Sequence, residues 1–258
     1  MSTIADTFAR CKVDGRAALI GYFPAGYPTV RESIEHVTAM VEAGCDIVEV
    51  GIAYSDPMMD GPTIQAAADT ALQAGVRVSD VFDVVRAVAE AGGVPVVMSY
   101  WNPILQYGVD AFAADLAAAG GQGIITPDLI PEEAEEWTVA AKAHGLGQMF
   151  LVAPSSTPER LKTTCDAASG FIYAQAVMGV TGARDAVSDL PKNLTRRVRE
   201  VSDLPVCVGL GVRSGDQAAE IAAYADGVIV GSAIITAAAE GESAVRALVA
   251  ELADGVRR

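Results

Sequence analysis

Carboxylates gather in the stretch VEVGIAYSDPMMDGPTIQ, which runs from Val48 to Gln65. Glu49 lies within an apolar, strand-like run, and Asp56 and Asp60 follow in a segment rich in proline and glycine. A carboxylate among apolar side chains costs several kcal/mol unless it is paired or protonated. A water-poor site would raise the pKa of Glu49 and make it usable as a proton donor and acceptor. The stretch therefore indicates acid–base chemistry, and a glutamate held in a buried hydrogen-bond network is the alternative interpretation.

The two aspartates have simpler interpretations when each is considered alone. Asp60 stands in an Asp-Gly dipeptide, which is ordinary turn chemistry, so a turn explains it as well as a site does. Asp56 precedes a proline, and a turn or capping role explains it better than a catalytic one. Glu49 is consequently the residue on which the chemical interpretation depends.

Glycine-rich turns near the C-terminus indicate an anion site. GLGVRSGDQ, with Gly211, and VGSAIITA, with Gly231 and Ser232, each follow a strand-like run and lead into helix-like sequence. Small residues let backbone N–H groups approach an oxyanion, and helix N-termini favour negative charge. GVTGAR, residues 179–184, could form a third wall or a mobile lid. These turns predict a phosphomonoester ligand, with plain tight turns as the alternative.

The segments that must position these residues alternate between strand-like and helix-like patterns. Val30, Ile34, Val37 and Val41 recur at helical spacing, and Gly44 is expected to supply the C-cap of that helix. Further helices are expected over 63–74, 78–91, 131–144, 157–168 and 215–224. Short apolar runs, rich in β-branched residues, predict eight strands at 17–23, 47–51, 94–100, 123–126, 148–153, 171–174, 205–210 and 227–231.

This alternation predicts a parallel sheet covered by helices. The strand count favours one closed (β/α)8 TIM barrel with extra helices, spanning residues 1–258 as a single domain. An open doubly wound sheet is disfavoured because no GxGxxG turn follows the first strand. In a barrel, if Val48 and Val50 face the helices, Ile47 and Glu49 point into the interior. Glu49 then lies near the C-terminal end of its strand, where barrel active sites form.

Composition excludes several classes of function. The formal net charge of -15 argues against nucleic acid and anionic membranes as partners. No apolar run approaches the roughly 20 residues that cross a bilayer, and the N-terminal sequence contains no export signal, so we expect a cytoplasmic protein. Neither a metal nor a histidine-based site is expected, because His36 and His144 are far apart in sequence. The scattered cysteines predict buried free thiols: Cys11, Cys45, Cys165 and Cys207.

The run DIVEVGIAYSDPMMDGPTIQ resembles the signature of the tryptophan synthase alpha chain family. The similarity continues in order through MSYWNPILQYG, ITPDLIPEE, FLVAPSS, FIYAQAVMGVTGAR, VGLGVRS and ADGVIVGSAI, and so covers essentially the whole chain. The resemblance implies a lyase that cleaves indole-3-glycerol phosphate to indole and glyceraldehyde 3-phosphate without a cofactor of its own. It also implies a beta chain that carries pyridoxal phosphate and forms an alpha2beta2 heterotetramer with this chain.

The resemblance also implies roles for individual residues. Glu49 matches the general acid–base of the family, and Asp60 matches the carboxylate that holds the indole N–H and stabilises positive charge on that nitrogen. Thr181 matches a lid threonine that closes towards Asp60. Tyr173 matches a tyrosine beside Glu49, and Tyr22 and Tyr100 match residues around the indole and the reacting groups. The matches to the phosphate-binding turns are Gly182, Gly211, Gly231 and Ser232.

The chain departs from the family pattern at a few positions. Ala53 replaces the usual proline and Met59 the usual alanine, which predicts a more flexible and bulkier loop after the second strand. Ala176 and Val177 stand before the lid, where serine and a basic residue are frequent. These departures lie in the loop and before the lid, and they leave the residues matched to the chemistry unchanged.

Three other functions would fit a barrel of this kind. A relative of indole-glycerol phosphate synthase would need a catalytic lysine at a strand end, and no predicted strand contains lysine. A glycoside hydrolase would use paired carboxylates but has no need for phosphate-binding turns. A barrel that only binds and activates a beta chain would not need both Glu49 and Asp60, which are present.

Overall fold

A nine-stranded parallel sheet forms the centre of the computed structural model, which describes residues 3–175, 189–209 and 211–258. Its strands follow one another in the order β5-β4-β3-β2-β1-β9-β8-β7-β6. The strands are β1 (Ala18–Pro24), β2 (Ile47–Gly51), β3 (Val94–Met98), β4 (Gly123–Ile125), β5 (Gly147–Met149), β6 (Leu151–Val152), β7 (Ile172–Gln175), β8 (Val206–Gly209) and β9 (Gly227–Val230).

The predicted fifth strand is present as two short pieces. β5 pairs with β4, and β6 pairs with β7, so the chain changes partners at Phe150. The Phe150 carbonyl accepts a hydrogen bond from the Tyr173 N–H at 3.2 Å, and the Gln148 carbonyl accepts one from the Ser169 N–H at 2.8 Å. These bonds connect the two ends of the sheet. The prediction of an eight-position (β/α)8 barrel is therefore confirmed, with one strand interrupted.

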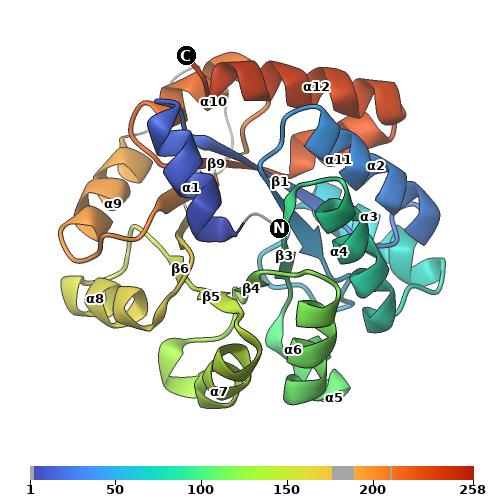
Figure 1. Ribbon diagram of the computed structural model, residues 1–258, viewed down its shortest axis with the longest axis horizontal. Coiled ribbons are helices and arrows are strands. Elements are labelled where there is room, and N and C mark those ends of the chain that lie inside the picture. Colours follow the sequence, from blue (N-terminus) through green and yellow to red (C-terminus); the bar gives the residue numbers. More distant parts are fainter. Residues whose placement is uncertain (1–2, 176–188, 210) are drawn as a thin grey trace.

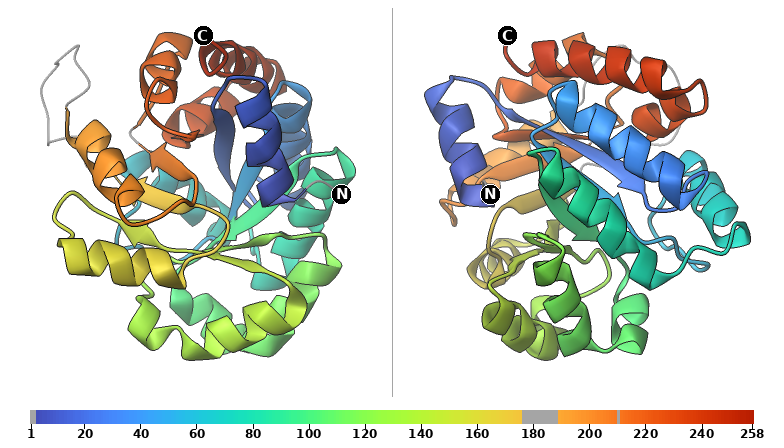
Figure 2. Two further views of the ribbon diagram at one scale, coloured as in Figure 1. Left: turned by 60° about the vertical axis from the view of Figure 1, so that its left-hand side comes forward. Right: turned by 45° about the vertical axis from the view of Figure 1, so that its right-hand side comes forward.

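Helices surround the sheet on its outside (Figure 2). They are α2 (Val30–Glu42), α3 (Pro62–Gln73), α4 (Val81–Glu90), α5 (Trp101–Tyr107), α6 (Val109–Ala118), α7 (Glu135–His144), α8 (Pro158–Ala167), α9 (Leu190–Arg199), α10 (Gly215–Ala222), α11 (Ser232–Ala238) and α12 (Glu242–Gly255). The predicted helices are confirmed to within a few residues. The cap of α2 is corrected: Ala43 is the C-cap, and Gly44 follows it with φ 112°, a conformation that favours glycine. No helix within the described residues is long and apolar enough to cross a membrane.

The apolar residues form two layers, as the alternation in β2 predicts. Val48 and Val50 belong to the large cluster between sheet and helices. Ile47 belongs to a separate cluster inside the barrel, which α1 (Ile4–Val13) covers with Phe8 and neighbouring side chains. Figure 1 shows α1 lying across this end of the barrel. The opposite end, where the strands terminate, is therefore the one that can be open to a substrate.

The four cysteines are buried and unpaired, as predicted. Cys45 and Cys207 lie among apolar side chains, and burial raises the pKa of each thiol well above its ordinary value. These thiols are consequently part of the core packing rather than reactive groups.

Candidate active site

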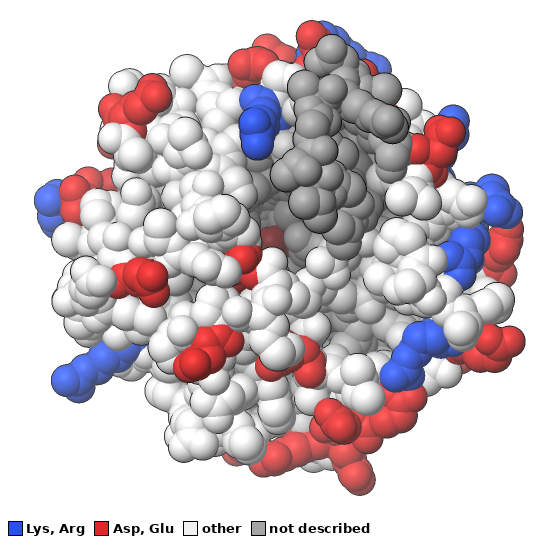
Figure 3. Space-filling view, turned by 180° about the vertical axis from the view of Figure 1, so that it is seen from behind, with Lys and Arg blue, Asp and Glu red and all other residues white. Residues whose placement is uncertain are grey.

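A cavity of about 410 Å³ lies at the C-terminal ends of the strands. This face is hollowed near its centre, and acidic side chains lie in and beside the hollow (Figure 3). Residues from widely separated parts of the sequence meet there because they follow different strands of one barrel. The lining residues that the sequence predicts as site residues are Tyr22, Glu49, Asp60, Tyr173, Gly211, Gly231 and Ser232. Tyr100 does not line this cavity, and Thr181 and Gly182 lie outside the described residues.

Glu49 is the most deeply buried carboxylate of this cavity. It lies in β2 opposite Tyr22 of β1, and only 1% of its surface is exposed. No described residue hydrogen-bonds to its Oε1 atom, so a structural hydrogen-bond network does not account for its burial. Burial alone raises the pKa of Glu49 to about 8. At neutral pH its carboxyl is therefore mostly protonated and can donate a proton into the cavity.

Glycines provide space for the two tyrosines beside Glu49. A Cβ atom on Gly51 would lie 2.6 Å from Cζ of Tyr22, and one on Gly209 would lie 2.7 Å from the hydroxyl oxygen of Tyr173. Such distances are too short for any real side chain, so both tyrosine rings require glycine at these strand ends. Burial raises the pKa of both hydroxyls, which stay protonated as hydrogen-bond donors. Sequence analysis missed Gly51 and Gly209, although their places at strand ends beside a cavity were a usable signal.

Asp60 ends the loop that follows β2, directly before Gly61, the N-cap of α3. The hydroxyl of Tyr100 donates a hydrogen bond to its Oδ1 at 3.1 Å, and the Gln65 side-chain amide donates to its backbone carbonyl at 2.8 Å. Burial raises the pKa of Asp60, and the hydrogen bond from Tyr100 partly opposes that effect. Asp60 therefore lines the cavity while its loop is held by contacts behind it. The hydroxyl of Tyr100 thus holds this loop, and its expected place around the indole stays a prediction.

The glycine turns predicted to bind an anion meet on the cavity wall. Gly211 follows β8 and has φ 67°, a conformation that most residues avoid. Gly231 follows β9 and forms the N-cap of α11, which begins at Ser232. Both turns lead into a helix, α10 or α11, as predicted. The structure thus places these turns on the same cavity as the two carboxylates, and their ligand stays a prediction.

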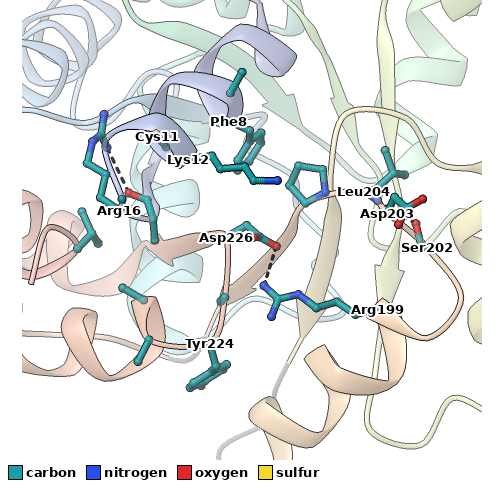
Figure 4. Close-up of a pocket in the computed structure, with 18 of the residues that line it drawn as sticks. Phe8, Cys11, Lys12, Arg16, Arg199, Ser202, Asp203, Leu204, Tyr224 and Asp226 are labelled. Atoms are coloured by element: carbon teal, nitrogen blue, oxygen red, sulfur yellow. Dashed lines mark hydrogen bonds and ion pairs between the residues drawn. The ribbon is translucent and has the colours of Figure 1, made fainter.

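A larger cavity, of about 750 Å³, lies at the opposite end of the barrel beside α1. Figure 4 shows that Arg199 and Asp226 face each other there, and their ion pair is 3.1 Å long. Arg16, also on this wall, is bound to Asp46 at 2.7 Å. These guanidinium groups are already paired within the protein, and neither Glu49 nor Asp60 lines this space. Among the described residues, no three His, Cys, Asp or Glu side chains come together as a possible metal site.

A parallel barrel with a protonated glutamate and a second carboxylate at its mouth defines a TIM-barrel enzyme with acid–base chemistry. A family model described as the tryptophan synthase alpha chain matches residues 8–257. The chain belongs to the tryptophan synthase alpha chain family. It is a lyase that cleaves indole-3-glycerol phosphate, in tryptophan biosynthesis.

Individual relatives agree with this assignment. A tryptophan synthase alpha chain from Mycobacteroides abscessus is 67% identical over 99% of this chain and 97% of its own length. One from Nocardia farcinica is 66% identical over 99% of this chain and 96% of its own length. A solved structure of Mycobacterium tuberculosis tryptophan synthase is 60% identical, covers 100% of this chain and 99% of its own, and superimposes with a TM-score of 0.95.

Proposed function

We propose that Glu49 carries both proton transfers of a retro-aldol cleavage and that Asp60 stabilises the charge formed between them. The protonated carboxyl of Glu49 donates its proton to C3 of the indole ring, which places positive charge on the ring nitrogen. The Asp60 carboxylate accepts the hydrogen bond of that N–H and stabilises the cation. The observation that carries this proposal is the burial of Glu49, which leaves it protonated with an oxygen at the cavity to which no described residue hydrogen-bonds.

The second transfer completes the reaction. Glu49, now ionised, takes the proton of the hydroxyl group on the carbon that is attached to C3. The C–C bond then breaks, its electron pair returns to the ring, and indole and the aldehyde of glyceraldehyde 3-phosphate are the products. Glu49 ends protonated, as it began, so one group serves as acid and base in each turnover. The protonated ring is the electron sink, and the chain therefore needs no cofactor of its own.

The remaining site residues are assigned to binding. Backbone N–H groups of the turns at Gly211, Gly231 and Ser232 hold the phosphate, and such a local device suits a chain whose net charge repels anions. Tyr22 and Tyr173 contact the substrate beside Glu49. Gly182 is assigned to the phosphate and Thr181 to the lid on the family resemblance alone. Met59 also lines the cavity, so its side chain replaces the smaller alanine usual in the family.

The partner is a beta chain that carries pyridoxal phosphate, in an alpha2beta2 heterotetramer in the cytoplasm. Exposed apolar side chains follow three adjacent strands on the side of the cavity: Met58 is 71% exposed, Leu105 46% and Ile130 41%. These positions lie after β2, β3 and β4, around the mouth from which indole must leave. A partner that covers them would shield apolar surface and receive indole directly, before it is lost into membranes.

A lyase assay on the isolated chain tests the proposal. Purified protein should form indole from indole-3-glycerol phosphate without any added cofactor, and Asp60→Asn should form it more slowly while keeping some activity, because an amide oxygen still accepts the indole N–H. Absence of indole formation both alone and with the beta chain would refute the catalytic assignment.

A further inference from the structure

The hydroxyl group of Tyr100 makes hydrogen bonds to three consecutive residues of the loop after β2. It accepts from the backbone N–H of Met58 at 3.1 Å and from that of Met59 at 2.9 Å. It donates to Oδ1 of Asp60 at 3.1 Å. A phenol has two acceptor sites and one hydrogen. Because both N–H groups can only donate, the single hydrogen of Tyr100 is directed to Asp60.

Tyr100 is itself fixed by the rigid part of the barrel. It follows β3, is 5% exposed and forms the N-cap of α5. The Ser99 hydroxyl donates to its carbonyl at 2.7 Å, and the next backbone N–H, that of Trp101, is held by Asp128 at 2.9 Å. Its ring packs beside Tyr54, with the ring centroids 5.5 Å apart. The loop that Tyr100 holds is less constrained. It contains no helix or strand between β2 and α3, and it exposes the Met58 side chain.

We propose that Tyr100 is a positioning residue, which fixes Met58 and Met59 and aims the Asp60 carboxylate at the substrate without touching the substrate itself. The inference rests on the proposed role of Asp60. The Tyr100 side chain does not line the cavity, whereas Asp60 does. Within the described residues, Oδ1 of Asp60 is held by Tyr100 and no hydrogen bond is made to Oδ2, which leaves Oδ2 for the indole N–H. Tyr100 thus acts on the substrate indirectly, through the Asp60 carboxylate.

Tyr100→Phe removes all three hydrogen bonds and keeps the ring. We expect kcat for indole formation to fall roughly tenfold to a hundredfold, because a displacement of about 1 Å in a catalytic group can cost that much. The Kd of glyceraldehyde 3-phosphate should change less than about twofold, since the phosphate turns are on other strands. Tyr54→Phe is the matched control: its hydroxyl lies in the same aromatic pair but accepts from the Asn102 side chain at 3.2 Å. It should keep kcat within about twofold of the parent.

A double-mutant cycle separates positioning from direct contact. If Tyr100 acts through Asp60, then in an Asp60→Ala background, where no side-chain oxygen remains to be aimed, Tyr100→Phe should cost less than about twofold further. The inference would be overturned if the losses in kcat of the two single variants multiply in the double variant. A Tyr100→Phe protein as active as Tyr54→Phe would overturn it as well.

Hydrogen exchange tests the anchoring without reference to activity. The amide hydrogens of Met58 and Met59 should exchange faster in Tyr100→Phe than in the parent. Their exchange rates in Tyr54→Phe should equal those of the parent. Unaltered exchange at both amides in Tyr100→Phe would overturn the inference even if activity falls. If the parent chain forms no indole, the proposed function fails, and the exchange rates still decide whether Tyr100 holds the loop.

Discussion

Glu49→Gln should slow turnover severely and make the protein more stable in alkaline solution. The physical reason is the same in both cases: a carboxyl that is 1% exposed has its pKa raised from 4.5 to about 8 by burial. Glutamine keeps the shape of the side chain but exchanges no proton. Loss of general acid–base catalysis typically costs about 10² to 10⁴ in rate, and in the proposed mechanism one group serves both steps.

The stability effect follows from the protons bound by the folded and unfolded chains. Below pH 4.5 Glu49 keeps its proton in both the folded and the unfolded chain, so folding changes neither its protonation nor its charge. Between 4.5 and about 8 the unfolded chain loses that proton while the folded chain retains it, so the free energy of unfolding falls as pH rises. Each pH unit costs about 1.4 kcal/mol, and the full cost above the folded pKa is on the order of 5 kcal/mol. Glutamine avoids this cost.

Urea unfolding of the parent and Glu49→Gln at about pH 5 and about pH 8.5 measures the effect. The advantage of the variant should grow by several kcal/mol between the two conditions. Glu133→Gln, the same change at an exposed position, is the control and should give a difference from the parent that does not vary with pH. A Glu49→Gln difference that stays constant with pH would refute the buried, protonated carboxyl. A variant that cleaves within about threefold of the parent rate would refute its role in proton transfer.

Three further outcomes follow from the site. Gly211→Val, at φ 67°, should raise KM for indole-3-glycerol phosphate far more than for its dephosphorylated analogue. Equal effects on both would refute the assignment of this turn to phosphate binding. Gly51→Ala should displace the Tyr22 ring and lower kcat, whereas Gly61→Ala, where a Cβ meets nothing within 4 Å, should be tolerated; similar kinetics for the two variants would contradict this. Mixing with the beta chain should give a larger particle in sedimentation and faster indole formation. If neither change is seen at micromolar concentration, the complex is excluded.

Sequence periodicity was sufficient for the barrel because strands and helices bury different faces. Alternation in IVEVG placed Val48 and Val50 against the helices and Glu49 inside, and both placements are confirmed. The interruption at Phe150 was beyond this reasoning, since an apolar run continues through it and only the partner strands reveal the change. Helix ends differed by up to four residues for a similar reason: propensity changes gradually, whereas the cap of α2 is set by the backbone of Gly44.

The site was predictable where function requires a residue type at a strand end, and less so where it depends on tertiary contact. Glu49 and Asp60 could be named from the sequence, and the structure brings them to one cavity. The hydrogen bond between Tyr100 and Asp60 joins residues 40 positions apart and has no local sequence signal. Gly51 does carry a local signal, a glycine at a strand end, but only the packed ring of Tyr22 shows why a side chain is excluded there.

The loop after β2 combines two demands that are hard to meet together. Its Met58 side chain is 71% exposed and available to a partner, and Asp60 must be held at a fixed place for the catalytic role proposed for it. One hydroxyl group serves both residues, because Tyr100 accepts from the Met58 N–H and donates to the Asp60 carboxylate. A partner that moves the Met58 backbone must therefore change the geometry of the bond that orients Asp60, and binding energy at the surface becomes a change in kcat. In Tyr100→Phe that connection is cut, so the beta chain should still bind but should accelerate indole formation by a smaller factor than it does for the parent chain.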